Sequence, residues 1–206
     1  MSDEPDLVAV PWPSDPRGTR LLPRVSAILK GSFEMPRDEA AALRGTYVHQ
    51  ATAMLDGGGD GSGLDWSDLD PALEGYVRSW ERGRDALALK VEMTECLVWS
   101  PAHRFVGHAD RIGVTGDRWA IVDLKTGGQE SWHRLQTAAY AQAASESLAG
   151  KGIIMRPAAC WRIALYLRAD GDMPASACWR GPDLFREDLA GFLACAQVWA
   201  WKRNHR

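Results

Sequence analysis

Residues 107–140, GHADRIGVTGDRWAIVDLKTGGQESWHRLQTAAY, decide the fold of this chain. Within them, residues 118–125 are apolar and β-branched and are bounded by glycines, which is typical of a strand. Side chains alternate along a strand, so Asp123 and Lys125 lie on one face while Leu124 points to the other. The stretch therefore predicts an acidic residue and a lysine side by side on one surface.

A second strand is expected just before this one. Residues 105–114 form another apolar run, and Gly116 and Asp117 separate the two runs. Gly at the first central position favours a two-residue type II′ turn, in which Thr115 pairs with Arg118. The turn therefore predicts which residues of the two strands face each other.

The predicted register brings two carboxylates together. It places Asp110 directly opposite Asp123, and a shift of the loop by one residue at each end moves Asp110 only to a diagonal position on the same face. A three-residue loop would break this pairing. Facing carboxylates about 5 Å apart repel each other and destabilise a sheet. A divalent cation would reverse that sign, because hard cations bind such oxygens.

Length and composition indicate an ordinary soluble globular protein. The chain has 206 residues, of which 46% are hydrophobic and 25% charged, enough for a substantial core. We expect residues 1–24 to form an irregular N-terminal arm and residues 25–206 to form a single domain with a C-terminal helix. No apolar run reaches about 18 residues and the start MSDEPDLVAV is acidic, so neither export nor membrane anchoring is indicated.

The charge distribution indicates the kind of partner, and cysteine usage indicates the cellular compartment. The net charge of −3 hides an asymmetry, since residues 1–75 hold 13 acidic and 6 basic side chains and residues 76–206 hold 14 acidic and 18 basic ones. The second part can form a locally basic groove, although a solvated surface explains these arginines equally well. The four cysteines lie far apart, which favours reduced thiols and a cytoplasmic location over disulfides or a CxxC metal site.

A helix that begins at Arg37 or Asp38 and ends at Leu55 is expected after the N-terminal arm, with Asp38 as its N-cap. Its apolar stripe consists of Leu43, Tyr47, Ala51 and Met54. His49 lies on the other side among small residues, which leave the imidazole room to approach another backbone or a metal. A lone histidine in such surroundings is more often a satisfied core or surface residue.

The rest of the chain predicts an α/β fold with a mixed central sheet flanked by helices. The expected elements are a helix over residues 71–89, strands over residues 91–99, 105–114 and 118–125, a helix from its cap Ser131 to about Leu148, strands over residues 160–168 and 175–180, and a last helix over residues 183–201 capped by Asp183. Residues 56–70 match neither a phosphate-binding loop nor an EF-hand, so we interpret them as a linker.

Four short motifs occur in an order that resembles a known family. They are RGTYVH at residues 44–49, GHAD at residues 107–110, DLK with its Asp thirteen residues later, and QTAAY eleven residues after that lysine. The set resembles the PD-(D/E)XK nuclease superfamily and, within it, the RecB-like exonuclease branch. The resemblance covers roughly residues 25–168 and implies a restriction-endonuclease-like core with the element order α-β-β-β-α-β.

The resemblance implies a role for several residues. His49, Asp110 and Asp123 would bind a divalent metal, and the backbone carbonyl of Leu124 would be a further ligand. Lys125 would orient the metal-bound water and offset charge in the transition state, so that it forms the catalytic set with the two aspartates. Oxygen ligands suit Mg²⁺ or Mn²⁺, and one histidine among them favours Mn²⁺ somewhat.

Further positions are implied around this set. Gln136 and Tyr140 match the branch's glutamine-tyrosine motif, which is associated with DNA contact and positioning. Either Glu92 or Glu95 can add an outer ligand, and the sequence does not choose between them. Asp123 stands where many relatives carry glutamate, yet the shorter side chain still reaches a metal. The four cysteines are too dispersed for the iron–sulfur cluster of some relatives, so no cluster is expected.

The function implied by this resemblance is a divalent-metal-dependent DNA exonuclease that acts on DNA ends in replication, recombination or repair, and the stand-alone size fits a virus-encoded enzyme. The alternatives are a structure-specific or nicking endonuclease and a catalytically idle nucleic-acid-binding or protein-binding module. A blander alternative is a buried ion pair between Asp110 and Lys125 with Asp123 solvated. DNA is the expected partner, and processivity without a helicase motor would need a homo-oligomer or a recombination or replication partner protein.

Overall fold

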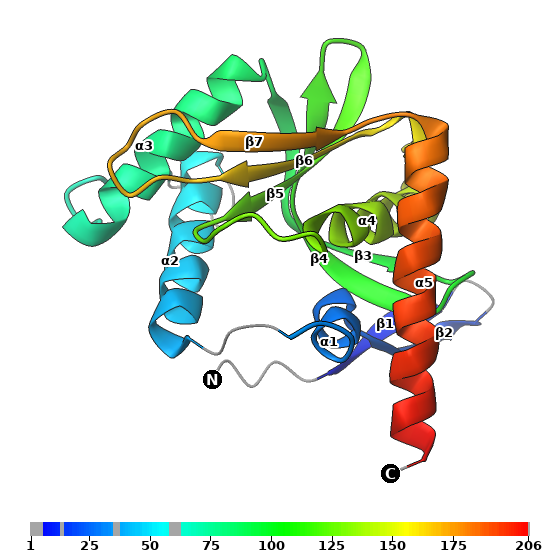
Figure 1. The fold of residues 1–206 in the computed structure, drawn as a ribbon. Coiled ribbons are helices and arrows are strands. Elements are labelled where there is room, and N and C mark those ends of the chain that lie inside the picture. Colours follow the sequence, from blue (N-terminus) through cyan, green and yellow to red (C-terminus); the bar gives the residue numbers. More distant parts are fainter. Residues whose placement is uncertain (1–5, 13–14, 35–37, 58–62, 206) are drawn as a thin grey trace.

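A mixed β-sheet forms the centre of the computed structural model (Figure 1). The structure describes residues 6–12, 15–34, 38–57 and 63–205. The sheet has the strand order β3-β4-β5-β6-β7. These strands are β3 (Lys90–Ser100), β4 (Phe105–Thr115), β5 (Arg118–Lys125), β6 (Trp161–Tyr166) and β7 (Ala175–Trp179). Only β5 and β6 run parallel among these neighbours, which confirms the predicted mixed sheet.

The β4–β5 hairpin has the register expected from its turn. Thr115 pairs with Arg118, and the ladder continues without a shift toward the other end of the hairpin. Gly116 has a φ of 60°, whereas Asp117 is not among the described residues with positive φ. This combination fits the predicted type II′ turn, because only the first central residue of that turn needs positive φ.

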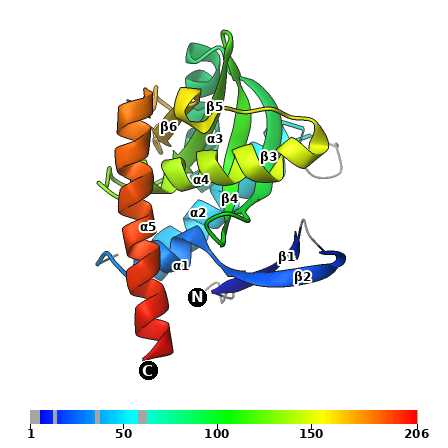
Figure 2. The ribbon, with the colours of Figure 1, turned by 90° about the vertical axis from the view of Figure 1, so that its right-hand side faces the viewer.

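Helices cover both faces of the sheet (Figures 1 and 2). They are α1 (Val25–Lys30), α2 (Glu39–Leu55), α3 (Pro71–Ala86), α4 (His133–Ser147) and α5 (Pro182–Asn204), and short 3-10 turns at Ala149–Lys151 and Pro157–Ala159 follow α4. Helix α4 packs on the sheet and α5 packs on α4, whereas α2 and α3 pack against each other. In the described part of the chain, no helix has both the length and the apolar character needed to cross a membrane.

Two apolar clusters hold these layers together. Ile112 and Ile121 of the sheet belong to the cluster that includes α4 and α5. Val122 and Ile163 belong to a second cluster with Trp80 of α3. Because Ile121 and Val122 are neighbours that point to opposite faces, β5 is buried on both sides, which explains its continuous apolar sequence. A buried β5 fixes the position of the polar residues at its end.

The N-terminal segment is more regular than predicted. We expected residues 1–24 to be irregular, but β1 (Leu7–Trp12) and β2 (Asp15–Pro23) pair as a separate antiparallel sheet. This sheet packs through Val10 against Val106 of β4. Prolines interrupt the apolar alternation here, so the contact that orders the segment has no periodic signal in the sequence. For the first five residues and the two at the hairpin tip, the expectation lies outside the described residues.

Helix α2 buries a different side from the one predicted. Leu43, Tyr47 and Met54 of the expected apolar stripe are 55%, 48% and 40% exposed. Of that stripe only Ala51 is buried, together with Val48 from outside it. The buried residues of α2 are Val48, Ala51 and Thr52, and His49 beside them reaches the carboxylate of Asp110 and the carbonyl oxygen of Leu124.

The predicted helix caps are confirmed only in part. Asp38 caps α2 as expected, since its carboxylate accepts a hydrogen bond of 3.0 Å from a backbone N–H of the first turn. The prediction that Ser131 caps α4 is wrong, because the helix begins at His133 and Trp132 is its N-cap residue. Asp183 lies inside the first turn of α5 rather than at its cap. Its charge still interacts favourably with the helix dipole there.

Gly75 of α3 is a position where close packing leaves no room for a side chain. A Cβ at this residue would lie 1.8 Å from the carbonyl oxygen of Ala169 in the β6–β7 connection. Because that atom belongs to the backbone, Gly75→Ala should lower the free energy of unfolding by about 2–3 kcal/mol, measured by urea denaturation. Gly127→Ala is the matched control, since a Cβ there would meet nothing within 4 Å. Equal losses in the two variants would contradict this packing.

Candidate active site

The residues predicted from the sequence converge at one end of the β4–β5 hairpin. They are Asp110 of β4, Asp123, Leu124 and Lys125 of β5, His49 of α2, and Gln136 and Tyr140 of α4. The β4–β5 ladder ends at the pair Arg111 and Val122, so both aspartates follow it directly. A cleft of about 460 Å³ lies beside them, lined by residues of α1, α2, β3, β4 and α4.

Two carboxylates and one imidazole, those of Glu95, Asp110 and His49, form a compact group in this cleft. Nδ1 of His49 lies 3.4 Å from Oδ1 of Asp110 and 3.7 Å from Oε1 of Glu95. One potential ligand atom from each of the three lies within 4.8 Å of the others. Nε2 of the same imidazole lies 3.1 Å from the carbonyl oxygen of Leu124. His49 therefore connects α2 to three strands at once.

The carboxylates control the charge of the imidazole. Burial alone would lower the pKa of His49, but the charge and hydrogen bonding of Asp110 and Glu95 outweigh it and raise the pKa to about 10. Burial also opposes ionisation of Asp110, yet the positive charges of His49 and Lys125 hold its pKa below the usual range. The group attracts positive charge strongly, and it would attract a metal cation for the same reason.

Lys125 is fixed by three neighbours. Its Nζ lies 2.6 Å from Oδ2 of Asp123 and donates a hydrogen bond of 2.9 Å to Oε1 of Gln136. The ammonium also lies 5.4 Å from the centre of the Trp132 ring, within cation–π range. Nε2 of Gln136 in turn donates a hydrogen bond of 2.8 Å to the hydroxyl of Tyr140. Helix α4 thus holds the lysine at the end of β5.

Asp123 is a buried carboxylate that the protein satisfies incompletely. Burial raises the pKa of Asp123 to about 6, with Lys125 opposing this rise and Asp110 adding to it. Oδ2 makes the ion pair with Lys125, but it has no hydrogen bond of good geometry among the described residues. The ammonium of Lys125 is therefore the group that stabilises the charge of this buried carboxylate.

The glycine of GHAD lets α4 approach β4. A Cβ at Gly107 would lie 2.4 Å from Cε1 of Tyr140, so only glycine allows the tyrosine ring to lie directly on the strand. Burial, followed by the charges of Asp123 and Asp110, raises the pKa of Tyr140 well above its usual range. Its hydroxyl therefore stays protonated beside the carboxylates.

The donor atoms at this end of the hairpin fit a divalent cation. They are the imidazole of His49, the carboxylates of Glu95 and Asp110, and the carbonyl of Leu124, whereas the carboxylate of Asp123 lies outside this compact group and pairs with Lys125. Carboxylate and carbonyl oxygens are the ligands that Mg²⁺ and Mn²⁺ prefer, and imidazole is compatible with Mn²⁺. The ligand role of each residue stays a prediction.

The structure separates the two glutamates of β3 that the sequence left equivalent. Glu95 lies in the group with His49, whereas Glu92 pairs with Lys90 at 2.7 Å. Alternation along the strand does not reveal this, because the β3–β4 register shifts near Glu92 and Glu95 has a φ of 46°. Glu95 is therefore the outer acidic residue of the site.

Two buried charged residues behind the site were missed in the sequence. We interpreted residues 56–70 as a linker, but Asp56 is buried and forms an ion pair of 2.6 Å with Arg111. For residues 58–62 the interpretation lies outside the described part of the chain. The available signal was an arginine directly after Asp110 in an otherwise apolar strand. Its partner, 55 residues earlier, had no motif to mark it.

A second polar pair lies within reach of the charge of Lys125. Nδ1 of His133 lies 3.0 Å from the hydroxyl of Tyr166 and accepts a hydrogen bond of 3.2 Å from the backbone N–H of Glu130. Burial and then the charge of Lys125 lower the pKa of His133 to about 3. The imidazole is therefore neutral, which is consistent with Nδ1 acting as an acceptor.

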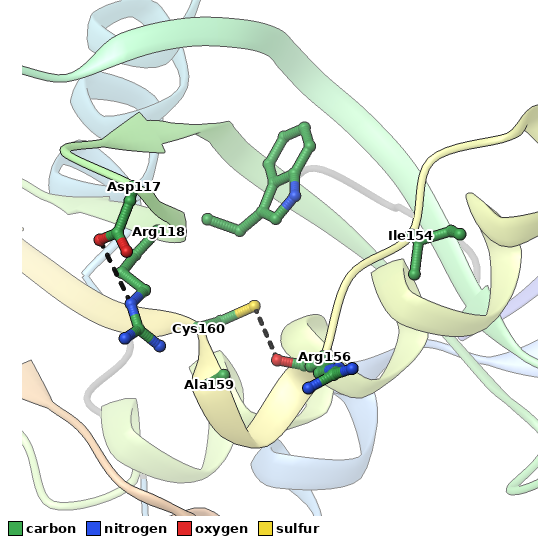
Figure 3. A pocket seen from close by; sticks show the side chains of 7 residues that line it. Asp117, Arg118, Ile154, Arg156, Ala159 and Cys160 are labelled. Carbon is green, nitrogen blue, oxygen red and sulfur yellow. Dashed lines mark hydrogen bonds and ion pairs between the residues drawn. The ribbon is translucent and has the colours of Figure 1, made fainter.

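Another pocket, of about 270 Å³, shares no lining residue with the cleft (Figure 3). Its lining consists of Asp117, Arg118, Trp119, Ile154, Arg156, Ala159 and Cys160. The thiol of Cys160 donates a hydrogen bond of 3.3 Å to the carbonyl oxygen of Arg156. Burial raises the pKa of this thiol to about 11, so Cys160 is a poor nucleophile and a poor metal ligand. The pocket offers no chemistry comparable to that of the cleft.

A mixed sheet with carboxylates, a histidine and a lysine at the end of one hairpin defines a nuclease-like site. A model of the PD-(D/E)XK nuclease superfamily matches residues 27–172, a span that includes every residue of this site, and the chain belongs to this superfamily. The membership confirms the superfamily that the four motifs predicted. A comparison with curated proteins finds no match.

Two solved structures of an exonuclease are similar to this chain at low identity. The alkaline exonuclease LHK-Exo from Laribacter hongkongensis has 15% identity and a TM-score of 0.29, over 75% of this chain and 91% of that chain. The structure of LHK-Exo in complex with dAMP has 17% identity and a TM-score of 0.32, over 88% of this chain and 92% of that chain.

His133 should give the stability of the protein a dependence on pH. Its pKa of about 3 in the folded state lies below the ordinary value of 6.5, so the unfolded chain binds the proton more tightly. Stability should therefore fall as the pH decreases from about 6.5 toward 3, by at most about 1.4 kcal/mol per pH unit from this residue. Urea unfolding at pH 7 and pH 5 measures the slope, and His133→Gln should flatten it. Identical slopes in both proteins would contradict the neutral imidazole.

Proposed function

We propose that this chain is a divalent-metal-dependent deoxyribonuclease of the RecB-like branch, acting as an exonuclease at DNA ends. The observation that supports it most is that His49 and Asp110 meet in one cleft while Asp110 also accepts a hydrogen bond from β5, where Asp123 and Lys125 form an ion pair, in a member of a nuclease superfamily. A purely structural sheet gains nothing from opposing two carboxylates, because their repulsion destabilises it. An idle module of the same fold would have no use for this set.

The ligand group has a defined part in this proposal. His49, Glu95 and Asp110 would hold the cation, and Asp123 and the carbonyl of Leu124 would complete its surroundings. A bound Mg²⁺ or Mn²⁺ would lower the pKa of a water and neutralise charge on the scissile phosphate. His49 must release its ring proton to become a ligand, so its affinity for metal depends on pH.

Lys125 contributes a fixed positive charge beside the aspartates. Two of its three N–H groups are directed to Asp123 and Gln136, so the third can donate to a water or to a phosphoryl oxygen. In this position it offsets the negative charge that develops while the bond from phosphorus to water forms and the bond to the leaving oxygen breaks. Gln136 and Tyr140 are positioning residues in this proposal, because they act on the lysine through a hydrogen-bonded chain.

DNA as the substrate and the exonuclease mode follow from the branch resemblance, as do a role in replication, recombination or repair and a homo-oligomer or partner protein for processivity. A cytoplasmic location follows instead from the four dispersed cysteines. The cleft wall supports a phosphate-rich polymer, since Gln50 and His108 line it and can donate to phosphate oxygens. The basic balance of residues 76–206, with 18 basic and 14 acidic side chains, also favours a polyanionic partner.

Lys125→Ala tests the catalytic assignment. The purified chain is incubated with linear double-stranded, linear single-stranded and closed circular DNA in the presence of Mn²⁺, Mg²⁺ or EDTA. We expect degradation of linear DNA only, and only with metal. Removing a charge that stabilises the transition state should lower the rate by about 100-fold or more. Time courses on agarose gels measure both results.

Lys90→Ala is the matched control for this experiment. Lys90 lies on the surface of the same sheet and pairs with Glu92, away from the cleft. Lys90→Ala should therefore leave the rate of DNA degradation unchanged. Cleavage of circles would favour the endonuclease, DNA binding without hydrolysis would favour the idle module, and full activity in Lys125→Ala would contradict the site assignment.

The two glutamates of β3 offer a second matched pair. Glu95→Gln should weaken Mn²⁺ binding by about tenfold or more, because it replaces a charged oxygen ligand by a neutral amide. Glu92→Gln should bind Mn²⁺ as the wild type does, since Glu92 is paired with Lys90 instead. Isothermal titration of each protein with MnCl₂ measures the dissociation constants. Indistinguishable constants for the two variants would exclude Glu95 from the ligand group.

A further inference from the structure

Arg111 is a fully buried arginine directly behind the proposed metal ligands. Its Nε forms an ion pair of 2.6 Å with Oδ2 of Asp56. Its Nη1 donates to Oε1 of Glu95 at 3.2 Å and to the carbonyl oxygen of Asp110 at 2.6 Å. Its Nη2 donates to Oγ1 of Thr52 at 2.8 Å. All three nitrogens are bonded, so the planar guanidinium is held in one orientation.

Asp56 is the residue that holds Arg111 in place. Besides the ion pair with Arg111, its carboxylate accepts a hydrogen bond of 2.7 Å from Nη1 of Arg84 and one of 3.0 Å from Nε1 of Trp80. The side chain is 1% exposed, so water does not compete for these contacts. Asp56 shares its negative charge between Arg111 and Arg84, so it offsets the charge of Arg111 only in part while it fixes the direction in which the guanidinium reaches Glu95.

Glu95 has a backbone conformation that requires such support. Its φ of 46° lies in the left-handed region, which residues other than glycine rarely adopt and which costs free energy. The β3–β4 register is regular immediately on both sides of Glu95, so the deviation is local. It directs the carboxylate to a point between Arg111, at 3.2 Å, and His49, at 3.7 Å. A strained residue at a ligand position is a feature of functional sites.

The same arginine also fastens α2 to the sheet. Thr52 and Asp56 lie three and seven positions after His49, and this spacing puts the three residues on one face of the helical turn. Arg111 bonds to both of them and follows Asp110 in the chain. The helix that bears the histidine is therefore tied to the strand that bears the buried aspartate.

We propose that Asp56 and Arg111 form a positioning pair that sets the affinity of the site for a divalent cation. Asp56 orients Arg111, and Arg111 holds Glu95 against the ligands on α2 and β4. The inference rests on the proposed metal dependence. It gives Asp56, the first residue of the predicted linker, a role in positioning a metal ligand.

The central experiment compares Asp56→Asn with the wild type in isothermal titrations of the purified full chain with MnCl₂. The amide keeps the shape of the carboxylate but cannot hold Arg111 as an ion pair. We expect the dissociation constant for Mn²⁺ to rise by about tenfold, as is usual when a residue behind a metal ligand is changed. The nuclease rate of Asp56→Asn, expressed relative to wild type, should be higher at saturating Mn²⁺ than at limiting Mn²⁺.

Asp188→Asn is the matched control for the loss of a buried ion pair. Asp188 is also 1% exposed and pairs with Arg162 at 2.9 Å, but it lies in α5, outside the cleft. Asp188→Asn should lower the free energy of unfolding, while its Mn²⁺ dissociation constant stays within about twofold of wild type. A rise equal to that of Asp56→Asn would mean that general destabilisation accounts for the effect, and the inference would be wrong.

A double-mutant cycle tests whether Asp56 acts through Glu95. In the Glu95→Gln background, Asp56→Asn should add less than about threefold to the dissociation constant, because the carboxylate to be positioned is already gone. Two effects that multiply fully would contradict the proposed route. If Asp56→Asn does not fold, Thr52→Val replaces it, since it removes one bond to Arg111 and leaves the ion pair. That variant should weaken Mn²⁺ binding about threefold, and wild-type affinity in it would contradict the inference.

The outcomes separate the inference from the proposed function. If the wild type binds Mn²⁺ and Asp110→Asn abolishes binding while Asp56→Asn leaves it unchanged, the positioning role is wrong and the metal site stands. If the wild type binds no Mn²⁺, the metal dependence fails and the inference fails with it.

Discussion

The repulsion between two buried carboxylates governs the end of the β4–β5 hairpin. Asp110 and Asp123 cannot move apart, because the two-residue turn fixes the register of their strands and the surrounding elements bury both. The protein responds by bringing positive charge to each of them, Lys125 to Asp123 and His49 to Asp110. These groups come from different elements, so the site exists only when the whole α/β core has assembled. The stability of the sheet and the chemistry of the cleft therefore depend on the same charges.

Helix α2 shows how this requirement changes ordinary packing. A helix usually buries its largest apolar side chains, but α2 leaves Leu43 and Tyr47 exposed and turns its small residues inward. His49 on this side reaches the carboxylate of Asp110, and the hydroxyl of Thr52 accepts a hydrogen bond from the buried Arg111. The helix therefore buries little apolar surface and instead makes the polar contacts of His49 and Thr52.

Local rules were enough to predict the centre of the fold. Strand alternation and turn chemistry gave the register of the hairpin, and the ordered motifs gave the superfamily. The rules failed where a residue depends on partners distant in the chain. Asp56 has its contacts in α3 and β4, Glu95 has a φ that alternation does not anticipate, and the N-terminal hairpin is ordered by packing on Val106. Each of these is a tertiary effect without a periodic signal.

The contact between Gly107 and Tyr140 joins the two ends of the stretch that decides the fold. The first residue has no side chain because the ring of the last one occupies that space. The GHAD and QTAAY motifs, which look independent in the sequence, therefore pack directly against each other through Gly107 and Tyr140. The spacing between them measures the length of chain needed to complete the hairpin, leave the sheet and return along α4. A larger residue at the first position requires a smaller ring at the last, so the identities of the two residues depend on each other.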